Sequence, residues 1–193
     1  MGVSLSKGQR ISLAKEGGGT LSQITMGLGW DVAKPKGFLG KMAGGGSIDL
    51  DASCMMFDAS KTLVDQVWFK QLKSRDGSVV HTGDNLTGAG EGDDESMHVD
   101  LSGVPAEVAA LVFVVNSFTG QSFAKVENAF CRVVDRSTGA ELFRYDLSGQ
   151  GDHTAQIMVK VYRHGSEWKI HAIGENTRGR TFKDLLPAVL PHL

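Results

Sequence analysis

The chain has 193 residues, of which 41% are hydrophobic and 22% charged, with a formal net charge of −2 at pH 7. These values describe one folded domain spanning residues 1–193 and exclude an intrinsically disordered chain. A pI near 6.3 gives no general attraction to nucleic acid, so no direct nucleic-acid binding is expected. The sequence has no apolar run long enough to span a membrane and no signal-like N-terminus, so a cytoplasmic location is expected. The two cysteines, Cys54 and Cys131, lie among apolar neighbours and are expected to be buried thiols.

Short apolar or alternating segments recur along the whole chain, separated by turns that contain glycine, which is typical of antiparallel strands. Strands are predicted at 3–6, 11–13, 24–30, 47–51, 62–72, 79–80, 97–101, 111–118, 128–135, 141–147, 155–163 and 167–173. Residues 105–110 are predicted as one or two helical turns, and 182–190 as a short helix interrupted at Pro187. About ten short strands in this arrangement predict an all-β fold, a β-sandwich with one or two short helices. Asn116 lies inside a predicted buried strand and requires a partner, either in the core or in a metal site.

The most unusual stretch is 81–95, which combines acidic residues, one amide and several glycines. Its members are Asp84, Asn85, Glu91, Asp93, Asp94 and Glu95, with Gly83, Gly88, Gly90 and Gly92. Residues 76–124 contain eight acids and no Lys or Arg, so the rest of the chain carries +6. Acids this close repel one another unless a cation lies between them. Oxygen ligands on a glycine-rich loop suit Ca²⁺, although a solvated acidic loop is the alternative interpretation.

A second acidic pair, Asp49 and Asp51, lies two residues apart in a predicted strand, which places both carboxylates on one face. The start of this segment is similar to an EF-hand loop. The pattern fails where Cys54 replaces the required Gly and Ser60 the required Glu, so a metal here would need ligands from elsewhere. The alternative is a solvent-facing pair on an edge strand.

Residues 34–46 interrupt the strand pattern and are predicted to be a surface insertion. The segment contains three lysines beside Phe38, Leu39 and Met42, a combination that could contact an acidic membrane surface or a protein partner. Peripheral association with the inner membrane is one hypothesis for it. An ordinary surface loop without a partner has the same composition and stays the alternative.

Motifs of catalysis are missing from the sequence, and no enzymatic activity is expected. There is no Gly-x-Ser-x-Gly elbow, no Walker loop, no Cys-x₂-Cys pair and no His-x₃-His spacing. Two alternatives stay open. The acids could serve a Ca²⁺- or Mg²⁺-dependent phosphoester hydrolase with His81 as base, or a binder of nucleotides or lipid headgroups through Ca²⁺.

Several motifs occur together in a fixed order over nearly the whole chain. They are 27–31 (GLGWD), 49–52 (DLDA), 81–88 (HTGDNLTG), 92–95 (GDDE) and 144–147 (RYDL). Together they resemble the TerD family of bacterial tellurium-resistance and stress proteins. Segments 36–40 (KGFLG), 116–118 (NSF), 120–123 (GQSF) and 126–132 (VENAFCR) resemble its TerZ branch.

The resemblance implies a β-sandwich that binds two Ca²⁺ ions and has no established enzymatic activity. It also implies action beside sister proteins of the same family and an integral membrane partner, with resistance to tellurite, some phages and pore-forming colicins. The ligand set that it implies comprises Asp31, Asp49, Asp51, Asp84, Asn85, Asp93, Asp94 and Glu95, with Gly88 and Gly90 in the same loop. One departure is Ala89, where the family commonly has an acid; another is Glu91, where it has Asp. If the position of Ala89 supplies a side-chain ligand, one ion would bind more weakly.

Overall fold

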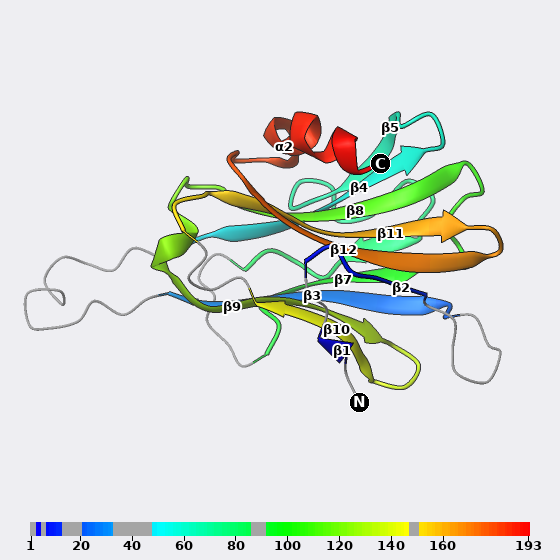
Figure 1. Ribbon diagram of the computed structural model, residues 1–193, viewed down its shortest axis with the longest axis horizontal. Helices are drawn as coiled ribbons and strands as arrows, with labels where there is room; N and C mark the ends of the chain where they lie inside the picture. The colour runs from blue at the N-terminus through cyan, green and yellow to red at the C-terminus, as the bar shows by residue number, and fades with distance from the viewer. Residues whose placement is uncertain (1–2, 5–6, 13–20, 33–47, 86–91, 147–150) are drawn as a thin grey trace, which may run out of the picture.

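A computed structural model describes residues 3–4, 7–12, 21–32, 48–85, 92–146 and 151–193. Two six-stranded sheets pack face to face, with a short helix on the outside of one of them (Figure 1). The predicted β-sandwich is therefore confirmed. The surface insertion predicted at 34–46 lies outside the described residues, and the division into domains stays a prediction.

Sheet A lies at the bottom of Figure 1. In spatial order it contains β1 (Val3–Ser4), β10 (Glu141–Asp146), β9 (Val126–Asp135), β3 (Gln23–Val32), β7 (Glu95–Asp100) and β6 (Val79–His81). All its pairs are antiparallel except the edge pair of β1 and β10, which is parallel.

Sheet B is entirely antiparallel and forms the second layer. In spatial order it contains β2 (Arg10–Ser12), β12 (Glu167–Thr177), β11 (Ala155–His164), β8 (Val108–Ser117), β4 (Leu50–Asp58) and β5 (Leu63–Val67). Three helical segments complete the described fold: η1 (Phe123–Lys125), α2 (Phe182–Val189) and η2 (Leu190–His192).

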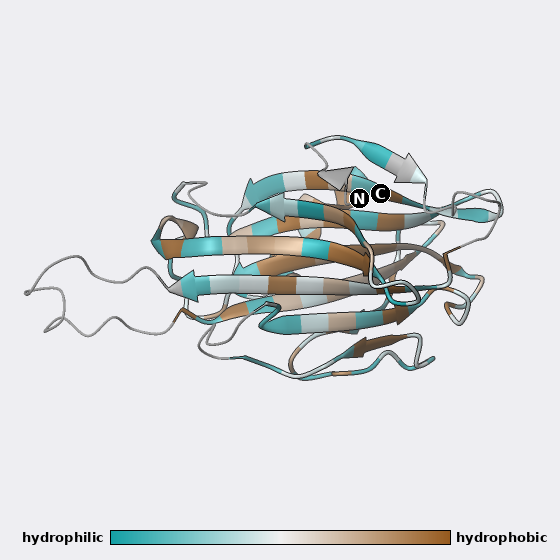
Figure 2. Cartoon of the chain, turned by 90° about the horizontal axis from the view of Figure 1, so that it is seen from below, coloured by the Kyte–Doolittle hydropathy of each residue, from teal (hydrophilic) through white to brown (hydrophobic). Residues whose placement is uncertain are grey.

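Alternation of apolar and polar residues along the strands sets the two faces of each sheet. Bands of contrasting hydropathy follow one another along the strands in Figure 2. The main core lies between the sheets, because every second side chain of a strand points inward. The two cysteines are free thiols buried in this core, and burial raises the pKa of both above the ordinary value.

Sheet B also buries residues on its outer face, because α2 packs there. Phe182, Leu185 and Val189 of the helix lie in one cluster with Met55 and Val112 of the sheet. This explains why sheet B carries long apolar runs instead of strict alternation, since strands covered on both faces are apolar throughout.

Four predictions of local structure are wrong. The strand predicted at 62–72 is shorter, since β5 ends at Val67 and a turn follows at 69–70. The helix predicted to be interrupted at Pro187 continues to Val189, because its apolar side packs on sheet B. Residues 108–110 are strand, the beginning of β8, and not helix. Strand β4 extends to Asp58, well beyond the predicted end at 51, because its residues are covered on both faces and show no alternation.

Candidate metal centre

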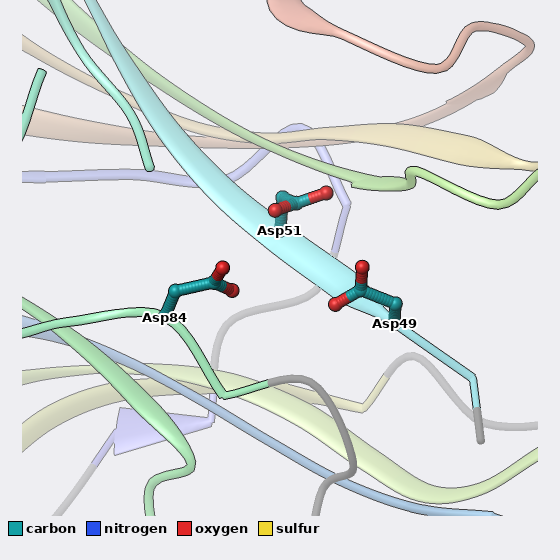
Figure 3. Close-up of side chains that lie close together, drawn as sticks. All are labelled: Asp49, Asp51 and Asp84. Carbon is teal, nitrogen blue, oxygen red and sulfur yellow. The ribbon is translucent and has the colours of Figure 1, made fainter. Parts of the chain in front are cut away.

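Three carboxylates meet at one end of the sandwich. Asp49 directly precedes β4, Asp51 lies within it, and Asp84 follows β6 of the opposite sheet. One oxygen from each side chain lies within 4.8 Å of the other two. Figure 3 shows the carboxylates of Asp49 and Asp84 turned toward each other, with Asp51 beside them. Asp49 and Asp51 lie on one face as predicted, and Asp84 offers the third carboxylate that a metal ion bound at this pair would need.

Within the described residues, no Lys or Arg forms an ion pair with the three carboxylates. Asp51 is only 3% exposed, and burial, together with the charges of Asp49, Glu95 and Asp84, raises its pKa to about 8. A hydrogen bond from Asn116 opposes this rise in pKa. Burial and the charges of Asp84 and Glu95 also raise the pKa of Asp49. The raised pKa values mean that the negative charges of these carboxylates are unfavourable here. Binding of protons or of a metal cation would neutralise them.

Two buried oxygens at the centre lack a hydrogen-bond donor within the described part of the chain. They are Asp49 Oδ1 and Asn116 Oδ1. The other end of the Asn116 amide is engaged, since Nδ2 donates to Arg180 O at 2.7 Å and to Asp51 Oδ2 at 3.3 Å. Asn116 therefore has partners in both the backbone and the acidic group. Buried acceptors without donors beside three carboxylates fit a hard cation that binds oxygen.

Glu95 connects the two sheets at this end. Its Oε2 accepts from Ala52 N of β4 at 2.8 Å, and its Oε1 accepts from Asn85 N at 3.2 Å. His81 Nε2 lies 3.4 Å from the same Oε2. Gly83 N donates to His81 Nδ1 at 3.1 Å, so the neutral ring carries its proton on Nε2, facing Glu95. His81 is 3% exposed, and its Nε2 has no hydrogen-bond partner within the described part of the chain.

A second acidic pair, Asp31 and Asp94, lies beside the first group. Trp30 N donates to Asp94 Oδ2 at 2.9 Å, and Asn85 Nδ2 donates to Asp94 Oδ1 at 3.0 Å. Burial, with the charges of Asp31 and Asp93, raises the pKa of Asp94 despite these hydrogen bonds. Asp31 lies on the exposed end of β3, where its Oδ2 accepts from Asn128 Nδ2 at 2.8 Å. Asn85 therefore contacts both acidic groups, through Glu95 on one side and Asp94 on the other.

Within the described ranges, Asp93 is the predicted ligand that forms an ion pair with an arginine. Arg132 of β9 donates from Nε to Oδ1 at 2.8 Å and from a second nitrogen to Oδ2 at 3.1 Å. Arg132 lies outside the base-free segment 76–124, so this counter-charge comes from a residue distant in sequence. The carboxylate lies over Gly27, where any Cβ would clash with it. The role of Asp93 as a metal ligand stays a prediction.

The remaining predicted positions lie outside the described residues: Gly88, Ala89, Gly90 and Glu91. Sequence reasoning missed Arg132 because nothing in its local sequence links it to a carboxylate 39 positions away. It also gave no role to Trp30, whose backbone donates to Asp94 and whose ring Nε1 donates to Ile48 O at 3.0 Å. Asn116 did give a signal in the sequence, because a polar residue inside an apolar run requires a polar partner, and that partner is part of the acidic centre.

Comparison with known proteins shows which family this chain belongs to. A family model described as the TerD domain matches residues 1–187 of the chain. The chain belongs to the TerD family. This TerD-family protein is 53% identical over 184 residues to tellurium resistance protein TerZ of Serratia marcescens, covering 95% of this chain and 94% of the relative. It is 45% identical over 196 residues to stress response protein SCP2 of Bacillus subtilis, covering 96% of this chain and 98% of that relative.

The fold of this TerD-family protein also occurs in solved structures. The crystal structure of a homologue of the telluride resistance protein from Streptomyces coelicolor superposes with a TM-score of 0.71 at 19% identity, covering 86% of this chain and 95% of that one. The predicted resemblance to the TerZ branch is confirmed. The relatives are named for tellurium resistance or stress response, and those names state no enzymatic activity. Within the described residues, no helix is long and apolar enough to cross a membrane.

Proposed function

We propose that this TerD-family protein is a Ca²⁺-binding stress-response protein in which Asp49, Asp51 and Asp84 hold one ion. The observation that carries the proposal is the meeting of these three carboxylates within 4.8 Å beside two buried oxygens without donors. All of these donor atoms are oxygens, and the group contains no His or Cys side chain. Oxygen donors suit Ca²⁺ better than Zn²⁺, and donors from separate segments suit the flexible coordination of Ca²⁺ better than the near-ideal octahedron that Mg²⁺ demands.

A second ion is proposed at Asp31 and Asp94. Support comes from the raised pKa of Asp94, to which the charge of Asp31 contributes. Asn85 contacts Asp94 through its side chain and Glu95 through its backbone, so Asn85 would lie between the two ion sites and contact both. Binding at one site would therefore influence affinity at the other.

The ion at the first site would join the two sheets, since Asp49 and Asp51 belong to sheet B and Asp84 follows β6 of sheet A. We expect calcium to fix the relative positions of these segments and of any surface that they form. This is the basis for a Ca²⁺-dependent interaction module that acts with sister proteins of the family and an integral membrane partner, from the cytoplasmic side of the inner membrane.

Calorimetric titration with Ca²⁺ and Mg²⁺ tests the metal assignment. We expect Ca²⁺ to bind with a Kd on the order of 10⁻⁷ to 10⁻⁵ M and Mg²⁺ more weakly. Asp49→Asn and Asp51→Asn should each weaken calcium binding. Glu107→Gln is the matched control, because Glu107 is exposed and precedes Val108, which pairs with Asp58 at the opposite end of β4. Equal affinity for both ions, or an unchanged Asp51→Asn, would contradict the assignment.

Affinity capture from the native cell tests the interaction role. Wild type, Asp51→Asn and Glu107→Gln are compared with calcium and with chelator. Partners that are retained only with calcium, by wild type and Glu107→Gln but not by Asp51→Asn, would support the proposal. Partners captured equally by all three proteins under both conditions would show that the interaction does not depend on the ion.

A further inference from the structure

Three basic side chains lie in a row across the outer face of sheet B. Arg10 of β2 pairs with His171 of β12, and His171 pairs with Lys160 of β11. Directly opposed residues of antiparallel strands project from the same face, with Cβ atoms about 5 Å apart. Lys160 in turn pairs with Val112, which packs under α2, so this face is the outer one. We call Arg10, Lys160 and His171 the basic row.

Lys160 of the basic row contacts both η2 and the aromatic ring of Tyr162. Lys160 Nζ donates to the backbone carbonyl of His192 in η2, which follows the helix that covers this sheet. The same Nζ lies 5.0 Å from the centre of the Tyr162 ring. Lys160 is therefore held in place and half-buried, while Arg10 is exposed. A small ligand approaching from solvent would meet the row beside η2.

The charges of the basic row are not neutralised by the described residues. No carboxylate among them lies within ion-pair distance of Arg10 or Lys160, although the net charge of the chain is negative. Burial lowers the pKa of Lys160, and the nearby charges of Arg10 and Lys61 lower it further. Burial lowers the pKa of His171 as well, followed by the charges of Arg10, Lys160 and His192. His171 Nδ1 is buried and has no hydrogen-bond partner within the described part of the chain.

Two acids of β12, the strand that carries His171, already have partners. On β12, Glu175 lies 3.0 Å from His192 Nε2, and Glu167 accepts from Ser12 Oγ at 2.9 Å. Lys169, two residues before His171 on the same strand, adds another positive charge to this face. Arg10, Lys160 and Lys169 are thus cations close to one another, His171 adds a charge only when its ring is protonated, and an anion would relieve the repulsion among them.

We propose that the basic row binds a phosphate group, either as free phosphate or as a phosphate monoester. The guanidinium of Arg10 can donate two parallel hydrogen bonds to phosphate oxygens, and Lys160 supplies a point charge. The ring of His171, between them, supplies a further donor when protonated. Three donors on three neighbouring strands suit the three terminal oxygens of a phosphate monoester better than the two oxygens of a carboxylate. This site is separate from the metal centre and does not depend on the proposed function.

The experiment follows the His171 ring by NMR while inorganic phosphate replaces chloride at constant ionic strength, with chelator present. We expect a saturable change, and a rise of about one pH unit in the His171 pKa, because an anion within a few ångströms favours the charged ring. Arg10→Gln and Lys160→Gln should each weaken phosphate binding about tenfold. Lys125→Gln, an exposed lysine at η1, is the matched control and should bind as wild type does. Arg10 is exposed, so Arg10→Gln gives a folded protein even if Lys160→Gln does not.

Two further arms separate the sources of the phosphate group. Vesicles containing phosphatidate are compared with vesicles of phosphatidylcholine alone, each with wild type and Arg10→Gln. Binding to phosphatidate that Arg10→Gln weakens and free phosphate displaces assigns the group to a lipid headgroup. Saturable binding of inorganic phosphate without vesicle binding assigns it to a soluble ligand. The proposal is overturned if phosphate gives no saturable change beyond chloride, or if Arg10→Gln and Lys125→Gln bind phosphate equally well.

Discussion

Replacing Asp51 by Asn should change the free energy of unfolding in two separate ways. One is the pH dependence of the apo protein, and the other is the stabilisation that calcium adds. Burial and three neighbouring acids raise the pKa of Asp51 to about 8, far above the ordinary value of 3.8. The folded state therefore holds this proton more tightly than the unfolded chain does. The resulting stabilisation is fully present below about pH 4 and is lost progressively as the pH rises to 8. In chelator, we expect the free energy of unfolding of wild type to fall by a few kcal/mol, to order of magnitude, across this window.

Asp51→Asn removes the titrating group but keeps an oxygen that can accept from Asn116 Nδ2. The apo variant should therefore lose most of this pH dependence, and near pH 8 it should be at least as stable as apo wild type. Calcium acts in the opposite direction. An ion that binds only the folded state adds about 2.7 kcal/mol at a hundredfold excess over Kd, a rise of several degrees in Tm for a domain of this size. The variant should show a much smaller rise.

Denaturant unfolding at several values between about pH 5 and pH 8, with chelator and with calcium, measures both effects. Wild type, Asp51→Asn and the control Glu107→Gln are compared. The reasoning is refuted if the apo pH dependence of Asp51→Asn equals that of wild type, or if calcium stabilises the two proteins equally. Glu107→Gln must follow wild type throughout, because its side chain is exposed far from the centre.

Three other predictions concern the packing that supports the centre. Because Asp93 pairs with Arg132, Asp93→Asn and Arg132→Gln should each lower the apo free energy of unfolding by about 1–3 kcal/mol. A double-mutant cycle measured by denaturant unfolding tests the pair, and fully additive losses would argue against it. Gly27→Ala should cost about 1–3 kcal/mol, since its Cβ would displace the Asp93 carboxylate; an unchanged urea midpoint would contradict this. Phe182→Ala should cost about 3–5 kcal/mol by emptying the contact between α2 and sheet B, whereas the exposed Lys183→Ala should leave Tm nearly unchanged.

The sandwich could be predicted because antiparallel strands with one buried face leave a period of two in the sequence. The same rule placed Asp49 and Asp51 on one face. The length of β4 could not be predicted, because α2 covers the outer face of its sheet and removes the alternation. For the same reason Pro187 does not end the helix. The burial of Phe182 and Val189 on either side of it outweighs the local preference against proline.

The candidate site was predictable only where its chemistry is local. The charge pattern of 76–124 identified a loop of acids, and the family resemblance added Asp31. The ion pair of Asp93 and Arg132 depends on the register of β3 and β9, which places Gly27 opposite Arg132 and leaves room for the carboxylate above it. The basic row on sheet B likewise joins residues from three strands, two of them at the far end of the chain from the first. Register of this kind is set by tertiary packing and leaves no local pattern.

The central claim is that an ion binds where Asp49, Asp51 and Asp84 meet, and luminescence of Tb³⁺ tests this location directly. Tb³⁺ substitutes for Ca²⁺ at oxygen sites and emits when a nearby tryptophan is excited. The ring of Trp30 lies beside this centre, since its Nε1 donates to the carbonyl of Ile48, the residue before Asp49. We predict sensitised emission that Ca²⁺ displaces, that Trp30→Phe abolishes while calcium binding persists, and that Asp51→Asn weakens. Emission that survives Trp30→Phe unchanged, or that Ca²⁺ does not displace, would contradict the account.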